Sequence, residues 1–151
     1  MSHFPLGSSN LPPVTSVIPH REPFLMVDSV LELREGYVAS TRLFREDEPF
    51  FASHFPGHPV VPAVLLVEGL AQTMAYYALL QRSAPEVLLV GIDRARFRSA
   101  VEPGMQVTFE VEIGLERFGI LTGKGRVRLG SHRVAEATLK GFAGDRARGA
   151  G

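Results

Sequence analysis

The chain of 151 residues contains no cysteine. This absence excludes disulfide bonds, thiolate ligands for a metal and a cysteine nucleophile, and it is compatible with a reducing cytoplasm. The charge is also balanced, because 16 basic residues oppose 16 acidic ones. No net field therefore draws nucleic acid or an anionic membrane to the surface, and we expect a cytoplasmic protein that does not bind nucleic acid.

The sequence also leads us to expect no targeting or membrane segment. Residues 1–16 have neither the basic start nor the apolar core of a signal peptide. Only residues 63–80 approach the length of a membrane span, and Glu68, Gln72 and Thr73 interrupt them. Because a carboxylate at the centre of a bilayer costs about 2.5–3.5 kcal/mol, we predict a buried core helix here and no association with a membrane.

The length suits one domain with a sizeable core. Residues 1–13 carry proline, serine and glycine without apolar periodicity, and residues 143–151 have no bulky apolar side chain. We therefore predict a flexible leader at 1–13, a single domain at 14–142 and a flexible tail at 143–151.

Strand patterns flank one helix in the predicted domain. Residues 49–62 hold several prolines and a glycine and must form a loop. Helix formers then run from Pro62, which suits the first helical position, to about Gln81. Strands are predicted at residues 24–33, 37–45, 86–98, 105–116, 119–129 and 132–142. In "QVTFEVEI", residues 106–113, apolar and polar side chains alternate, so the fold class is α+β with an antiparallel sheet covering the helix.

Glu68 is the single acidic residue on the predicted helix. Val64 and Gln72 lie one turn before and one turn after it on the same helical face. Carboxylates are rarely buried in so apolar a helix without a reason. Two interpretations follow: a structural acid paired with Gln72 or a backbone N–H, or a general acid that holds its proton near neutral pH in dry surroundings.

The start of this helix offers backbone donors. Pro62 has no N–H, so the unpaired donors of the first turn are predicted to belong to Ala63, Val64 and Leu65. At the positive end of the helix dipole they can hold the oxygen of an ester or thioester carbonyl as it gains negative charge. Every helix has such an end, so this feature alone does not identify a site.

His54 and His58 stand four residues apart, but Pro56 between them excludes the helix that would join them in a metal site. With no cysteine in the chain either, we predict no metal. A loop histidine usually faces solvent. Neighbouring phenylalanines nevertheless place His54 in apolar surroundings, where a neutral imidazole can act as a base.

Arg94, Arg96 and Arg98 alternate with apolar residues and are predicted to share one face of a strand. This face is either an ordinary solvated surface or one that receives an acidic partner. The residue types alone do not separate these interpretations.

Three segments together resemble a known enzyme family. "IPHREPFLMVDSV" (18–30), "EPFFASHFPGHPVVPAVLLVEGLAQ" (48–72) and "GIDRARFRSAVEPGMQV" (91–107) are similar, in order and spacing, to β-hydroxyacyl-acyl-carrier-protein dehydratases of the FabZ type. The likeness covers residues 17–142. Its most specific part is HFPGHPxxP followed by a glutamate 14 residues after the first histidine.

The resemblance implies a hotdog fold, in which an antiparallel sheet wraps around the central helix. It also implies a homo-oligomer, either a dimer joined edge to edge or a trimer of dimers. In this family the active site lies at the dimer interface and takes its histidine from one subunit and its acid from the other. The implied substrate is a 3-hydroxyacyl chain on an acyl carrier protein, the implied product is a trans-2-enoyl thioester, and no cofactor is implied.

Matched by position, His54 is similar to the family's catalytic histidine and Glu68 to its catalytic acid. Glutamate rather than aspartate at position 68 favours the FabZ type over the related isomerising dehydratases. The N–H of Val64 falls where the thioester carbonyl is held, and Gln72 matches a residue that hydrogen-bonds the acid. The implied substrate-binding residues are Gly57, Ala63, Val64 and Gln72.

Ala63 and Ser53 depart from the family, which usually has glycine at both positions. The methyl group of Ala63 adjoins the expected path of the thioester and disfavours a positive φ. Two alternatives therefore stay open: a hotdog acyl thioesterase, and a non-catalytic acyl-binding partner subunit. For the dehydratase, Arg94, Arg96 and Arg98 are the predicted contacts to the acidic carrier protein.

Overall fold

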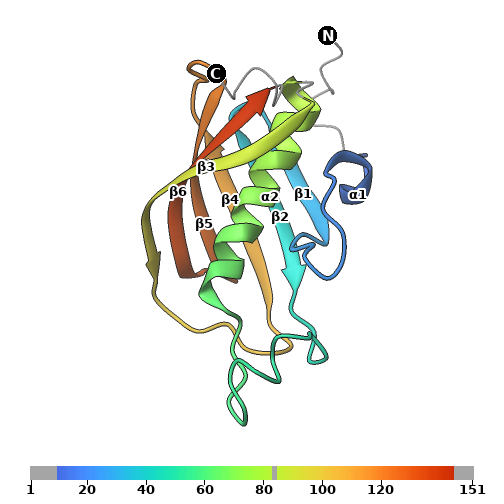
Figure 1. Cartoon of the computed structure of the whole chain (residues 1–151), viewed down its shortest axis with the longest axis vertical. Helices are drawn as coiled ribbons and strands as arrows, with labels where there is room; N and C mark the ends of the chain where they lie inside the picture. Colours follow the sequence, from blue (N-terminus) through green and yellow to red (C-terminus); the bar gives the residue numbers. More distant parts are fainter. Residues whose placement is uncertain (1–9, 83–84, 145–151) are drawn as a thin grey trace.

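The computed structural model describes residues 10–82 and 85–144. One long helix lies against an antiparallel sheet of six strands, which curves around it (Figure 1). The strand order is β1-β2-β4-β5-β6-β3. The elements are α1 (Val14–Val17), β1 (Ser29–Arg34), β2 (Tyr37–Leu43), α2 (Ala63–Arg82), β3 (Glu86–Phe97), β4 (Gln106–Ile113), β5 (Ile120–Leu129) and β6 (His132–Gly144). The predicted α+β hotdog fold is confirmed.

The central helix α2 is buried by the sheet. Residues 63–81 are long and apolar enough to cross a membrane by composition, yet 61% of their most apolar stretch is buried inside the fold. The predicted core helix is therefore observed. It begins one residue later than expected, because Pro62 caps it: the Pro62 carbonyl accepts the N–H of Leu65 at 2.9 Å.

Strand β4 crosses beneath the helix and shows the predicted alternation. Val107, Phe109 and Val111 are fully buried, whereas Glu110 and Glu112 face the other side of the sheet. Small residues let the helix approach closely, since a Cβ atom at Gly123 would lie 2.6 Å from the sulfur of Met74. The helix and the sheet therefore share one continuous core.

The predicted strand at 24–33 is wrong in its first half. β1 begins at Ser29, because the backbone before it bonds elsewhere. The N–H of Met26 donates to the side chain of Gln72 on α2 at 2.7 Å, and residues 25–27 are buried as an irregular segment against the helix. The short helix α1 was not predicted either, and β2 and β4 end two and three residues earlier than expected.

The predicted leader and tail stay predictions, because residues 1–9 and 145–151 lie outside the described part of the chain. Just inside these limits, the hydroxyl of Tyr76 donates to the carbonyl of Pro12 at 2.7 Å. At the other end, Ala143 and Gly144 belong to β6.

Candidate active site

His54 lies in the loop that precedes α2. This loop extends below the helix in Figure 1. The Nδ1 atom of His54 is 2.9 Å from the carbonyl oxygen of Val60. A carbonyl can only accept, so Nδ1 carries the hydrogen and the neutral ring has its free lone pair on Nε2. The Phe55 ring stacks on the imidazole with centroids 4.1 Å apart. The loop thus presents a half-buried imidazole whose Nε2 can accept a proton.

The hollow beside His54 also includes the start of α2 and the end of β3. Its volume is about 410 Å³, and it is lined by His54, Val60, Val61, Ala63, Leu66, Phe97, Arg98, Ser99, Ala100 and Val101. Val64, at the same helix start, is 72% exposed. The prediction of a free N–H at Leu65 is wrong, because this N–H donates to the carbonyl of Pro62. Ala63 and Val64 keep N–H groups without a helical carbonyl.

The departures from the family pattern cause no backbone strain here. Ala63 is the first residue of a regular helix, and it is not among the described non-glycine residues with positive φ, so its methyl group costs nothing in conformation. Ser53 is exposed, and its hydroxyl lies 3.4 Å from the carbonyl of Phe50. Gly57 has a φ of 74° at an exposed turn and does not line the His54 hollow. The positive φ of this turn therefore explains why position 57 is a glycine.

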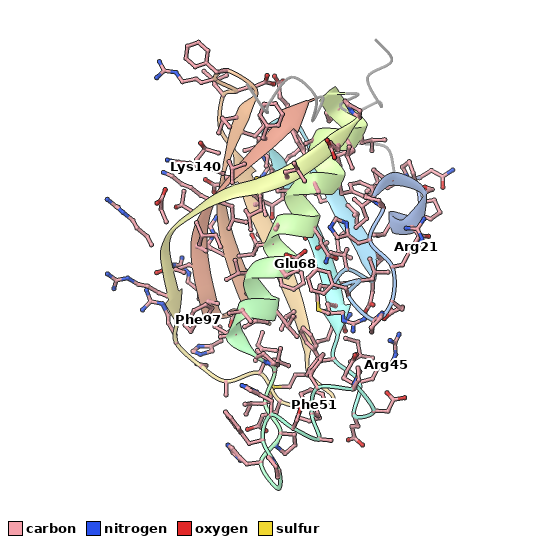
Figure 2. The ribbon with its side chains drawn as sticks, in the orientation of Figure 1. Arg21, Arg45, Phe51, Glu68, Phe97 and Lys140 are labelled. Atoms are coloured by element: carbon pink, nitrogen blue, oxygen red, sulfur yellow. The ribbon has the colours of Figure 1, made fainter. Side chains whose placement is uncertain are left out.

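Glu68 lies in the first half of α2 (Figure 2), with 20% of its side chain exposed. Its Oε1 atom accepts a hydrogen bond of 3.1 Å from Nε2 of Gln72, as the spacing predicts. The amide of Gln72 is fixed at both ends: its oxygen accepts the N–H of Met26, and its nitrogen also donates to the carbonyl of Phe24 at 2.9 Å. Gln72 therefore always offers Glu68 a donor.

A second, largely apolar hollow adjoins Glu68. Its lining residues are His20, Glu68, Ala71, Met74, Ala75, Val87, Leu88, Leu89 and Gly141. No local pattern predicts a role for His20, which lies in segment 18–30. Its Nε2 atom is 3.8 Å from Oε1 of Glu68. The only available signal was a histidine just before a buried apolar stretch, and no periodicity connects positions 20 and 68.

The structure does not bring His54 and Glu68 together within one chain. His54 lines one hollow and Glu68 another, and no hollow found among the described residues includes both. A site that uses both groups therefore needs a second copy of the chain. No group of three or more histidine or acidic side chains in the described ranges is arranged to hold a metal ion.

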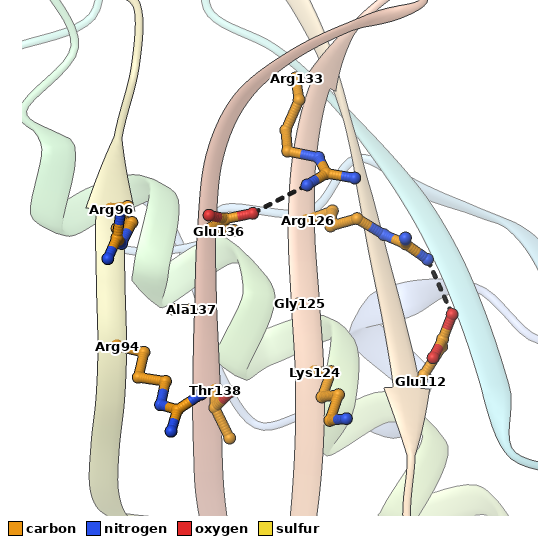
Figure 3. A pocket seen from close by; sticks show the side chains of 10 residues that line it. All are labelled: Arg94, Arg96, Glu112, Lys124, Gly125, Arg126, Arg133, Glu136, Ala137 and Thr138. Atoms are coloured by element: carbon orange, nitrogen blue, oxygen red, sulfur yellow. Dashed lines mark hydrogen bonds and ion pairs between the residues drawn. The ribbon is translucent and has the colours of Figure 1, made fainter.

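The predicted arginines lie on the outer face of the sheet. Arg94 and Arg96 line a hollow together with Lys124, Arg126 and Arg133, where the acidic residues are Glu112 and Glu136 (Figure 3). A bulge between Asp93 and Arg96, with φ of 53° at Arg94, interrupts the simple alternation that the sequence predicts. Because of this bulge, the positions of Arg94 and Arg96 are not set by a regular two-residue repeat.

Charges are unevenly paired across this surface. Arg98 donates to Glu136 at 2.7 Å, and Arg133 contacts the other carboxylate oxygen at 3.0 Å. The hydrogen bond from Arg98, with help from Arg133, holds the pKa of Glu136 below its usual range. Within the described residues no ion pair is formed by Arg94 or Arg96, so these two cations stay available to a partner.

Comparisons with known proteins identify the relatives of this chain. The family profile of the FabA-like domain matches residues 18–138. A 3-hydroxyacyl-[acyl-carrier-protein] dehydratase FabZ from Symbiobacterium thermophilum is 46% identical over 130 residues, which are 82% of this chain and 89% of the relative. The enzyme of the same name from Chloroflexus aggregans is 43% identical over 132 residues, 83% of this chain and 90% of that protein.

Solved structures share the fold at lower identity. The dehydratase heterocomplex ApeI:P from Xenorhabdus doucetiae gives a TM-score of 0.79 at 17% identity, covering 91% of this chain and 95% of that one. Protein PH1136 from Pyrococcus horikoshii gives 0.59 at 16% identity, covering 83% and 88%. At these identities the likeness extends to the fold alone.

Proposed function

The chain belongs to the FabA-like domain family, and we propose that it is a 3-hydroxyacyl-acyl-carrier-protein dehydratase of the FabZ type. The observation that carries this proposal is that the chain holds both a carboxyl group bonded to Gln72 and, in a separate hollow, an imidazole whose tautomer leaves Nε2 free. The reaction removes water from a 3-hydroxyacyl thioester and gives a trans-2-enoyl thioester. It serves fatty-acid synthesis or a related lipid or polyketide pathway in the cytoplasm.

His54 is the proposed base. Removal of a C2 proton gives the thioester enolate character, and Nε2 of His54 accepts that proton while Nδ1 stays bonded to the Val60 carbonyl. The N–H of Val64, at the exposed first turn of α2, is the proposed donor to the thioester oxygen. Ala63, which lines the same hollow as His54, shapes the approach to this donor, whereas Gly57 forms the turn of the loop that carries His54.

Glu68 is the proposed acid. Hydroxide is a poor leaving group, so the C3 oxygen must receive a proton as its bond to carbon breaks. Glu68 lines the hollow that also includes Val87, Leu88 and Leu89 of β3, and there its carboxyl group can reach the C3 oxygen of a bound substrate. The proton removed at C2 and the proton donated at C3 balance, and no cofactor enters the reaction.

The proposed assembly is a homodimer, alone or as a trimer of dimers. β3 is an edge strand of 12 residues that exposes Leu88, Leu89, Val90, Ile92 and Phe97. A long apolar edge of this kind favours pairing with another strand. Pairing two copies along β3 would place residues of the Glu68 hollow and the His54 hollow, both of which include β3 residues, at one interface.

Complementation tests the shared site. We expect His54→Ala and Glu68→Gln to abolish dehydration of a 3-hydroxyacyl thioester separately. Mixed dimers of the two variants contain one intact site and one doubly altered site, so unfolding and refolding an equal mixture should restore about a quarter of wild-type sites. Each variant refolded alone is the control. No recovery in mixtures proven to contain heterodimers would contradict a site built across the interface.

Arg94, Arg96 and Arg98 are the proposed contacts to the acidic carrier protein. Arg96 has no ion pair within the described part of the chain and lines the basic hollow, so Arg96→Glu should raise KM for a carrier-bound substrate. The same substrate on a short thiol lacks the acidic protein and serves as the control, with KM unchanged. Equal KM values for wild type and Arg96→Glu on the carrier would remove this residue from the docking surface.

The two alternatives give different results in the same assay. An acyl thioesterase would release a free thiol from the thioester. A non-catalytic partner subunit would bind acyl carrier with or without His54. The relatives named above are dehydratases, and no feature of the described residues favours either alternative.

A further inference from the structure

His20 is an ionisable residue that the proposed reaction does not use. It lies in the loop between α1 and β1, and 26% of its side chain is exposed. Among the residues that line the Glu68 hollow, His20 and Glu68 are the only ionisable ones, and the others are apolar or glycine. Gln72 does not line this hollow, and its amide already donates to Glu68.

The loop that carries His20 is fixed by several hydrogen bonds. The guanidinium of Arg21 donates to three carbonyls, those of Thr15 at 3.0 Å, Ile18 at 2.9 Å and His20 at 2.8 Å. Downstream, Phe24 and Met26 are bonded to Gln72 on α2. The imidazole is therefore presented to Glu68 by a segment that is anchored on both sides.

The burial of Nδ1 selects a tautomer. This atom is buried, and it has no hydrogen-bond partner among the described residues. A buried N–H without an acceptor is rarer in proteins than an acceptor whose lone pairs are incompletely used. The neutral ring with its hydrogen on Nε2 is therefore favoured. That hydrogen belongs to the atom 3.8 Å from Oε1 of Glu68, which is slightly beyond hydrogen-bonding distance.

We propose that His20 is a positioning residue for Glu68. Its Nε2–H and the amide of Gln72 both address Oε1, so that the carboxyl proton resides on Oε2 and faces the C3 hydroxyl of the substrate. A displacement of about 1 Å converts the present contact into a hydrogen bond. The inference rests on the proposed dehydration, in which Glu68 must be protonated before it reacts.

Matched variants test this role. His20→Phe keeps the ring and removes the donor, whereas the amide of His20→Gln can place an N–H near the position of Nε2. We expect His20→Phe to lower kcat about tenfold with KM changed less than about twofold. A loss of this size is expected when one hydrogen-bond donor that acts in the transition state is removed. His20→Gln should recover most of kcat. His20→Leu replaces the phenylalanine variant if that variant does not fold, as judged by circular dichroism.

The pH profile separates positioning from mere support of the fold. A donor at Oε1 favours the carboxylate, so its removal favours the protonated acid, and the alkaline fall in kcat should move to higher pH in His20→Phe but not in His20→Gln. An unchanged kcat and profile in His20→Phe, or equal defects in both variants, would overturn the role of His20. An inactive wild type would instead overturn the proposed function, and the role of His20 with it.

Discussion

Gly69→Ala is expected to destabilise the fold although alanine is the better helix former. A Cβ atom at position 69 would lie 2.5 and 2.7 Å from Cε1 and Cε2 of Phe109, and closer still to Cζ. Phe109 is fully buried on strand β4, between β2 and β5 in the sheet, so neither its ring nor its backbone can retreat freely.

The magnitude follows from two opposing effects. Alanine in place of glycine within a helix gains about 1 kcal/mol. Overpacking a rigid core costs about 1–3 kcal/mol, and three ring atoms in contact place this site at the upper end. The net loss is therefore about 2 kcal/mol in the free energy of unfolding. For a domain of this size it lowers Tm by about 4–8 °C.

Urea unfolding and thermal scans of four variants measure the effect. Phe109→Leu shortens the ring that the methyl group would meet, so the double variant Gly69→Ala/Phe109→Leu should lose less stability than the sum of the two single losses. Gly114→Ala is the control, because its Cβ atom would lie 3.5 Å from the Thr122 carbonyl, an ordinary contact. If Gly69→Ala were as stable as the wild type, the close seating of α2 on β4 would be refuted.

Three further predictions concern a buried hydroxyl pair, the hollow beside Glu68 and two tyrosines. Thr73→Val leaves the buried hydroxyl of Ser40 without its 2.7 Å partner and should cost about 1–3 kcal/mol by urea unfolding, less when combined with Ser40→Ala. Met74→Val deepens the hollow beside Glu68 and should raise kcat/KM for longer 3-hydroxyacyl chains relative to shorter ones. Burial raises the pKa of Tyr37 and of Tyr76 from 10.0 to about 12, with the Glu110 hydrogen bond adding to the effect at Tyr37. Because the neutral phenols are favoured in the folded state, their stabilising effect is complete below pH 10 and declines as pH rises toward 12. Ultraviolet titration of Tyr37→Phe and Tyr76→Phe checks the two raised pKa values, because each variant lacks one of the titrating phenols.

Local patterns predicted most of the fold. The run without proline after Pro62 defined α2, and the alternation at 106–113 assigned the buried face of β4. The segment 24–28 was mistaken for a strand because its apolar residues have the composition of one. Its backbone instead bonds to the side chain of Gln72, which is 46 positions away in the chain from Met26. A contact between residues so far apart in the sequence cannot be predicted from a local pattern of residue types.

The same limit applies to the candidate site. Glu68 and Gln72 were predicted as a pair because one helical turn joins them, and the bond between them is confirmed. His20 was missed because it reaches Glu68 through tertiary packing alone. The roles of His54, Val64, Ala63 and Gly57 stay predictions, because one chain holds the two proposed catalytic groups in separate hollows.

The glycines beneath α2 limit how this scaffold can diversify. A side chain at Gly123, Gly125 or Gly141 would meet the ends of Leu70 or Met74, so the three glycines let these helix side chains lie directly on the sheet. New substrate ranges cannot then arise by tilting the helix, since tilting would also displace Glu68. They must arise by resizing individual side chains along its far half, which leaves the acid where it is.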